Sequence, residues 1–155
     1  MLYTASSLYI KLWNTPVSNP LAHSDYENGK VENWGIEYQE GRMLVGMIGF
    51  GHIDIAHGNG EVGYVLSRKH WRNGIVSNAI RLVVLEGFTS LGLQKIIGRC
   101  ISENIGSKRV LQKVGFKKEG DLRRQYLKRN SFRDIEIYGL LRSEQGQENQ
   151  CKESI

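Results

Sequence analysis

The sequence predicts a single mixed α/β domain in which three strands precede a long helix and further strands follow it. Alternating apolar residues indicate strands at residues 34–38, 43–53 and 61–66. Apolar residues recur instead at helical spacing between Val76 and Phe88. The chain has 155 residues, 40% of them hydrophobic, which is enough for one substantial core.

The N-terminal segment, residues 1–30, has little clear periodicity because two prolines and an Asn-Gly pair interrupt it. We expect an N-terminal arm or a short helical segment there. One domain should follow at residues 31–142, and a polar C-terminal tail at 143–155. Turns at residues 40–42 and 58–60 should join the first three strands of the domain into an antiparallel meander.

The elements after the long helix are also legible. A strand is predicted at Lys95–Ile101, and a shorter helix at Ile105–Val114, which Gly115 ends. Two closing strands should follow, one near Phe116 and one over residues 132–141. The order of elements is therefore three strands, helix, strand, helix and two strands.

The charge balance is basic, with a net charge of +5 and a pI near 9.3. A basic balance can indicate a phosphate-rich partner. Nucleic-acid binding and a solvated basic face both fit the residues that cluster around Tyr126. No RNA-binding signature is legible, so we favour the solvated face and consider nucleic acid an unlikely partner. The cluster consists of Arg123, Arg124, Lys128, Arg129 and Arg133.

Other classes of protein find little support in the sequence. No apolar run approaches the roughly 20 residues of a membrane span, and no signal peptide is evident, so we expect a cytoplasmic protein with no membrane partner. Cys100 and Cys151 are too few and too isolated for a disulfide framework or a zinc site. No metal-ligand spacing is present, and Cys100 should be a buried strand residue.

The most informative segment is the stretch Trp71-Arg72-Asn73-Gly74-Ile75-Val76-Ser77, a basic, glycine-containing loop that enters the long helix. The first amides of a helix have no intrahelical acceptor, and the helix dipole leaves partial positive charge at that end. A phosphate group can bind there. The strand, loop and helix thus follow the order that a nucleotide-derived cofactor requires.

This loop resembles the acetyl-CoA loop of the GNAT N-acetyltransferases, and within them the RimJ/RimL-like branch. Trp71 takes the first position of the loop motif, Gly74 its central glycine and Val76 its last position. A second stretch resembles the branch in both order and spacing. It comprises Asn104, Ile105, Gly106, Ser107, Leu111, Lys113, Gly115, Phe116, Glu119, Gly120, Asp134 and Tyr138.

The resemblance implies a GNAT fold, with a mixed, mostly antiparallel sheet, splayed central strands and flanking helices, here with an abbreviated N-terminus. It implies acetyl-CoA as cosubstrate, no metal, and transfer of an acetyl group to a primary amine, foremost a protein N-terminal α-amine of the ribosomal-protein type. A small-molecule amine acetyltransferase, a catalytically idle acetyl-CoA-binding domain and an RNA-associated protein remain alternatives. A homodimer or higher oligomer could complete the acceptor side.

The resemblance also assigns residues to roles. Glu61 is the candidate base on the third strand, with a strand anchor as the alternative. Ser107 is the candidate donor toward the departing thiolate, with a helix-capping residue as the alternative. The candidate cofactor-binding residues are Leu66, Trp71, Arg72, Asn73, Gly74, Ile75, Val76, Ser77 and Asn104.

Several positions depart from the family pattern, among them Arg72, Val76 and Leu111. Arg72 stands where the family often has glycine, and Val76 puts a branched side chain where glycine or alanine usually lets the pyrophosphate approach. Leu111 occupies the position of the tyrosine acid of the RimI-like branch, and Leu111 cannot donate a proton. We expect cofactor binding to survive because the backbone amides remain.

Overall fold

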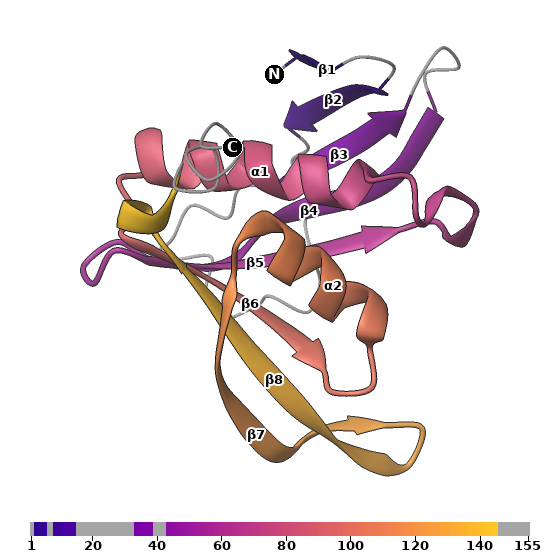
Figure 1. Ribbon diagram of the computed structural model, residues 1–155, viewed down its shortest axis with the longest axis vertical. Helices are drawn as coiled ribbons and strands as arrows, with labels where there is room; N and C mark the ends of the chain where they lie inside the picture. Colours follow the sequence, from indigo (N-terminus) through magenta and orange to yellow (C-terminus); the bar gives the residue numbers. More distant parts are fainter. Residues whose placement is uncertain (1, 6–7, 15–32, 39–42, 146–155) are drawn as a thin grey trace, which may run out of the picture.

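The computed structural model describes residues 2–5, 8–14, 33–38 and 43–145. These residues build an eight-stranded sheet in the order β1-β2-β3-β4-β5-β6-β8-β7 (Figure 1). The elements are β1 (Leu2–Ala5), β2 (Leu8–Asn14), β3 (Asn33–Tyr38), β4 (Met43–Asp54), β5 (Asn59–Leu66), η2 (Arg68–His70), α1 (Ile75–Thr89), β6 (Lys95–Ile101), α2 (Ile105–Val114), β7 (Lys117–Lys128), β8 (Ser131–Leu141) and η3 (Arg142–Glu144).

The described part of the N-terminal segment is strand. β1 and β2 pair antiparallel, and β2 pairs antiparallel with β3, placing Ile10 opposite Tyr38. A short helical segment is therefore wrong for residues 2–5 and 8–14, whereas an extended arm agrees with them. Residues 15–30 lie outside the described part of the chain. The antiparallel meander of β3, β4 and β5 is confirmed.

Helix α1 connects two parallel neighbours, β5 and β6. Their pairing extends from Asn59 opposite Lys95 to Val62 opposite Gly98 and then stops. β5 nevertheless continues to Leu66, and β6 continues to Ile101. The two central strands therefore separate after four paired positions, which confirms the predicted splay and opens a gap between them.

The last strand lies between two earlier ones. β8 pairs antiparallel with β6 on one side and with β7 on the other. The β7–β8 hairpin extends away from the rest of the molecule in Figure 1. β7, for which the sequence indicated only a strand near Phe116, is 12 residues long and begins at Lys117. The hairpin is twisted by irregular register between Leu122 and Tyr126.

The main core lies between the sheet and the helices. α1 contributes most of the buried helical side chains, including Ala79, Ile80 and Phe88 at 0 to 1% exposure. α2 lies beside α1 and covers β6 (Figure 1). The approach is close at Gly98, where a Cβ atom would lie 2.6 Å from a methyl carbon of Leu111. Leu111, the residue at the missing tyrosine position, is thus a core residue.

Candidate active site

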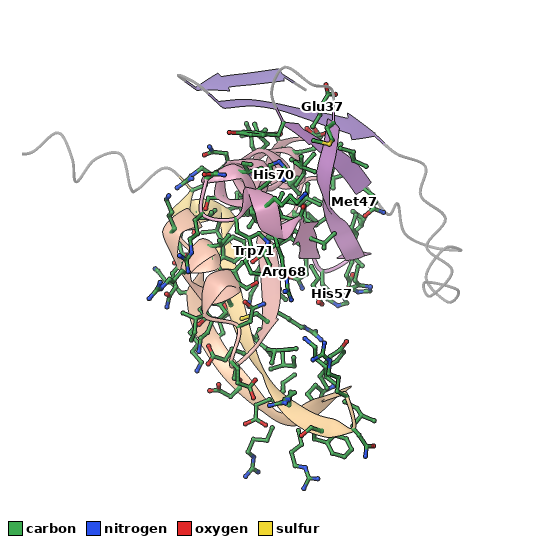
Figure 2. The ribbon with its side chains drawn as sticks, turned by 90° about the vertical axis from the view of Figure 1, so that its right-hand side faces the viewer. Glu37, Met47, His57, Arg68, His70 and Trp71 are labelled. Atoms are coloured by element: carbon green, nitrogen blue, oxygen red, sulfur yellow. The ribbon has the colours of Figure 1, made fainter. Side chains whose placement is uncertain are left out.

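The loop between β5 and α1 is fastened to the end of β5. The chain turns through η2, and the Trp71 indole Nε1–H then donates a hydrogen bond of 2.9 Å to the Leu66 carbonyl oxygen. The ring itself is 56% exposed, and the Arg68 guanidinium lies 5.8 Å from its centroid. Figure 2 shows Arg68 and Trp71 close together where the chain enters α1. This hydrogen bond holds the loop at the open end of the gap.

Two left-handed residues shape the loop. Arg72 has φ +65° and Gly74 has φ +73°. The left-handed conformation costs an L-residue about 1–2 kcal/mol, whereas glycine adopts it freely. The position of Arg72 is the one where the family often has glycine, and its dihedral explains that preference. Asn73 stands exposed between the two residues.

The first turn of α1 presents free backbone donors. Gly74 is the N-cap residue, without a side-chain cap, and the first turn contains no acidic residue. Within the described structure, the earliest α1 amide with a backbone acceptor is Asn78 N–H, which donates to Gly74 O at 3.1 Å. The amides of Ile75, Val76 and Ser77 precede it. They stand at the positive end of the helix dipole, where an anion is favoured.

Val76 does not obstruct these amides. Its side chain is only 9% exposed and belongs to the core, as does that of Ile75 at 1%. Ser77 is also buried, at 4% exposure. The branched side chain of Val76 thus packs into the core, which supports the expectation that its backbone amide remains available to a phosphate group.

The start of α2 lies against the gap between β5 and β6. The Asn104 side-chain Oδ1 accepts a hydrogen bond of 3.1 Å from the Ser107 N–H, and Asn104 is the N-cap of α2. Asn104 thus fills the capping role, and the Ser107 hydroxyl is left for another partner. Tyr64 lies in the part of β5 that no longer pairs with β6, and the Ser107 side chain is close enough to lower the pKa of Tyr64.

Glu61 lies on the opposite face of the sheet. Its neighbours Gly60 and Val62 are buried toward the helices, so the alternation of β5 directs Glu61 the other way. Its Oε2 forms an ion pair with Arg99 Nε at 3.2 Å, and both side chains are partly exposed. The structure therefore does not bring Glu61 and Ser107 into contact. They flank the closed end of the gap from its two sides.

A buried polar cluster under α2 was missed by the sequence analysis. The Glu136 carboxylate accepts hydrogen bonds from Lys108 Nζ at 2.8 Å and from the Tyr138 hydroxyl at 2.7 Å. These hydrogen bonds, that of Lys108 above all, lower the pKa of Glu136 to about 2. Burial, together with Glu136, holds the pKa of Tyr138 far above its usual value. Tyr138 belongs to the second family-like stretch, but no motif pairs it with Glu136 and Lys108, because the cluster joins a helix to a strand about 28 residues further along the chain.

Cys100 lies on β6, paired with Glu136 on β8, and is 7% exposed, as predicted for a buried strand residue. Burial raises the pKa of its thiol. In the described ranges, no group of three or more His, Cys, Asp or Glu side chains could hold a metal ion. Those same ranges contain no helix that is both long and apolar enough to cross a membrane.

The basic residues around Tyr126 lie on the β7–β8 hairpin. Arg133 forms an ion pair with Glu103 at 2.9 Å, and the Arg124 guanidinium lies 4.9 Å from the Phe132 ring centroid. Tyr126 and Phe132 are about half exposed. Two of the five cations thus have partners on the protein itself, which agrees with the interpretation of this cluster as a solvated face.

Comparisons with known proteins agree with this architecture. The uncharacterized N-acetyltransferase YoaA of Bacillus subtilis is 37% identical over 117 residues, covering 76% of this chain and 66% of YoaA. The ribosomal-protein-serine acetyltransferase of Escherichia coli is 28% identical over 95 residues, covering 61% of this chain and 53% of that protein. The chain thus spans less than two thirds of the length of these relatives.

A mutant of the spermidine N-acetyltransferase SpeG from Vibrio cholerae has the same fold, with a TM-score of 0.73 at 20% identity over 84% of this chain and 76% of that one. The family model described as the acetyltransferase (GNAT) domain matches residues 9–117, which include the loop, the gap and both long helices. On this match, the chain belongs to the GNAT acetyltransferase domain family.

Proposed function

We propose that this protein is an acetyl-CoA-dependent N-acetyltransferase that acetylates a primary amine. The observation that carries the proposal is the junction of Arg72, Gly74 and the first turn of α1, directly beside the gap between β5 and β6. The amides from Arg72 to Ser77 suit the pyrophosphate of acetyl-CoA. The unpaired backbone of β5 and β6 suits the amides of its pantetheine arm.

The reaction is acyl transfer from a thioester to an amine. The amine must be neutral to attack the carbonyl carbon, and the thiolate must leave with its electron pair. Glu61, at the closed end of the gap, is the proposed base on one face of the sheet. Ser107 is the proposed hydrogen-bond donor to the thiolate on the other. Asn104 supports Ser107 by capping α2.

The two faces give each reactant its own approach. On the Glu61 face, a Cβ atom on Gly63 would contact nothing within 4 Å, so this side of the gap is open to an incoming amine. The helix face, where Ser107 lies, is closed by α2. An amine entering from the Glu61 side can attack directly in a ternary complex while the sulfur departs toward α2.

For the acceptor, we favour a protein N-terminal α-amine. An α-amine titrates near 8 and a lysine near 10.4, so the α-amine demands less of a weak base. Similarity to the ribosomal-protein-serine acetyltransferase and to the RimJ/RimL-like motifs supports this choice. A small polyamine is the second candidate, which the fold of the spermidine enzyme permits without favouring.

The deciding experiment measures acetyl-CoA binding by calorimetry and free-thiol release with a panel of amines, including short peptides that begin with serine or alanine, spermidine and free lysine. Thiol release that depends on a peptide α-amine supports the proposal. Binding without thiol release for any amine would identify an idle acetyl-CoA-binding domain. Absence of binding would contradict the proposal as a whole.

A further inference from the structure

The hydroxyl of Tyr64 is buried without a hydrogen-bond partner in the described part of the structure. Tyr64 is at the second position of β5 beyond the last residue paired with β6, and it lies on the same face as the buried Val62. A buried hydroxyl without a partner costs about 1–3 kcal/mol, so each such group in a native protein calls for an explanation, and a catalytic role is one. The proposed roles of Glu61 and Ser107 do not use this hydroxyl.

Two side chains near Tyr64 define its surroundings. Burial raises the pKa of Tyr64, the Ser107 side chain lowers it, and Cys100 raises it. The Ser107 side chain therefore lies close to the Tyr64 hydroxyl, which has no hydrogen-bond partner by geometry in the described part of the structure. Since burial raises the pKa of Tyr64, it favours the protonated phenol, which is the form that donates a hydrogen bond.

We propose that Tyr64 and Ser107 together form a two-hydroxyl site that donates hydrogen bonds to the sulfur of the departing thiolate. The inference rests on the proposed acetyl transfer and adds a residue to it. When the carbon–sulfur bond breaks, its electron pair stays on sulfur, and both hydroxyls keep their protons while they stabilise the negative charge. The proton lost by the amine leaves through Glu61 or water.

This arrangement offsets the departure of the chain from its family. Leu111 occupies the position of the tyrosine acid and is a buried core residue. A serine hydroxyl alone is a single, weak donor. A phenol on β5 supplies the second donor, so the leaving group is held from both strand and helix.

The test compares the binding of CoA and of desulfo-CoA, which lacks the thiol, by calorimetry between pH 7 and pH 9.5. Wild-type protein should increasingly prefer CoA as its thiol ionises near pH 8.5. The Tyr64→Phe variant should lose roughly 10- to 100-fold of that preference, the range for a hydrogen bond to a charged group. Tyr38→Phe, which removes a hydroxyl from another half-buried tyrosine, should keep it.

The same variants are compared in turnover and in thermal unfolding. Tyr64→Phe should lower kcat with little change in the KM for acetyl-CoA. Its melting temperature should not fall, because the hydroxyl has no hydrogen-bond partner among the described residues. In the Tyr64→Phe/Ser107→Ala double variant, kcat should fall by a smaller factor than the product of the factors for the two single variants.

The inference is overturned if Tyr64→Phe keeps the wild-type preference for CoA over desulfo-CoA. It is also overturned if the only effect of Tyr64→Phe is a lower melting temperature. If wild-type protein binds neither CoA nor acetyl-CoA, the proposed function fails and the inference fails with it. If wild-type protein transfers acetyl groups and Tyr64→Phe does so equally well, only the inference fails.

Discussion

Lys108, the residue after Ser107 on α2, lies with its Nζ 2.8 Å from the carboxylate of Glu136 on β8. Glu136 is buried and also accepts a hydrogen bond from the Tyr138 hydroxyl, so its ion pair with Lys108 fixes the first turns of α2 against the sheet. The position of the Ser107 hydroxyl in the gap therefore depends on a charge pair outside the gap.

This pair predicts how stability depends on pH. The pKa of Glu136 is lowered from 4.5 to about 2 in the folded protein, so its contribution is fully present above pH 4.5 and is lost as pH falls toward 2. The contribution is on the order of 3 kcal/mol. Urea unfolding at pH 6, 4 and 2.5 should show that the free energy of unfolding falls more steeply with decreasing pH for wild type than for Glu136→Gln. Glu119→Gln, which removes a more exposed ion pair with Lys95, is the control.

The phosphate loop can be tested with a pair of matched glycines. Gly74 and Gly92 both have left-handed backbones, with φ +73° and +68°, and a Cβ atom on either would meet nothing within 4 Å. Substitution by glutamate should therefore cost each about 1–2 kcal/mol of stability. Only Gly74→Glu should weaken acetyl-CoA binding, by roughly 100-fold or more, because its charge repels the phosphates. Equal affinities of the two variants in calorimetry would refute the loop assignment.

At Val76, the family motif and the observed burial of the side chain predict different effects of a smaller residue. The family pattern suggests that a smaller residue here would let the pyrophosphate come closer. The side chain is buried in the core, so Val76→Ala should leave acetyl-CoA affinity unchanged within about twofold and destabilise the protein by about 1–3 kcal/mol. Tighter binding by this variant would show that the side chain does face the ligand.

Glu61 is tested through its partner. If Glu61 is the base, Glu61→Gln should lower turnover by about 10- to 10,000-fold and alter the pH profile, whereas Arg99→Gln should retain activity. If Glu61 only anchors the strand through Arg99, both variants should behave alike, with a wild-type pH profile and a similar loss of stability. The comparison requires one identified acceptor and pH-dependent kcat for all three proteins.

The sequence predicted the elements whose side chains face a core on one side. The helix Ile105–Val114 and the strand Lys95–Ile101 were predicted at their observed bounds, because buried residues recur in them at the period of each structure. For β7 the sequence indicated a strand near Phe116 but not its bounds. Nearly all of its side chains are exposed, so it has no apolar alternation to read, and its pairing with β8 is determined across the hairpin.

The site was predicted unevenly for similar reasons. The loop from Trp71 to Ser77 was legible because a local glycine and a helix start carry its geometry. The Lys108–Glu136 pair and the orphan hydroxyl of Tyr64 were not, because each depends on residues that the fold brings together from distant segments. The direction of the Val76 side chain likewise depends on where the first turn of α1 meets the core.

The early end of pairing between β5 and β6 has a consequence for hydrogen exchange. Central strands of a sheet usually exchange their amide hydrogens only when the whole domain unfolds. From Gly63 to Leu66, β5 is bonded to β4 on one side and, among the residues that the structure describes, has no strand partner on the other. We therefore expect a short window of rapid exchange in the middle of the molecule, bordered by slow amides at Val62 and in β4, which acetyl-CoA should close when it binds.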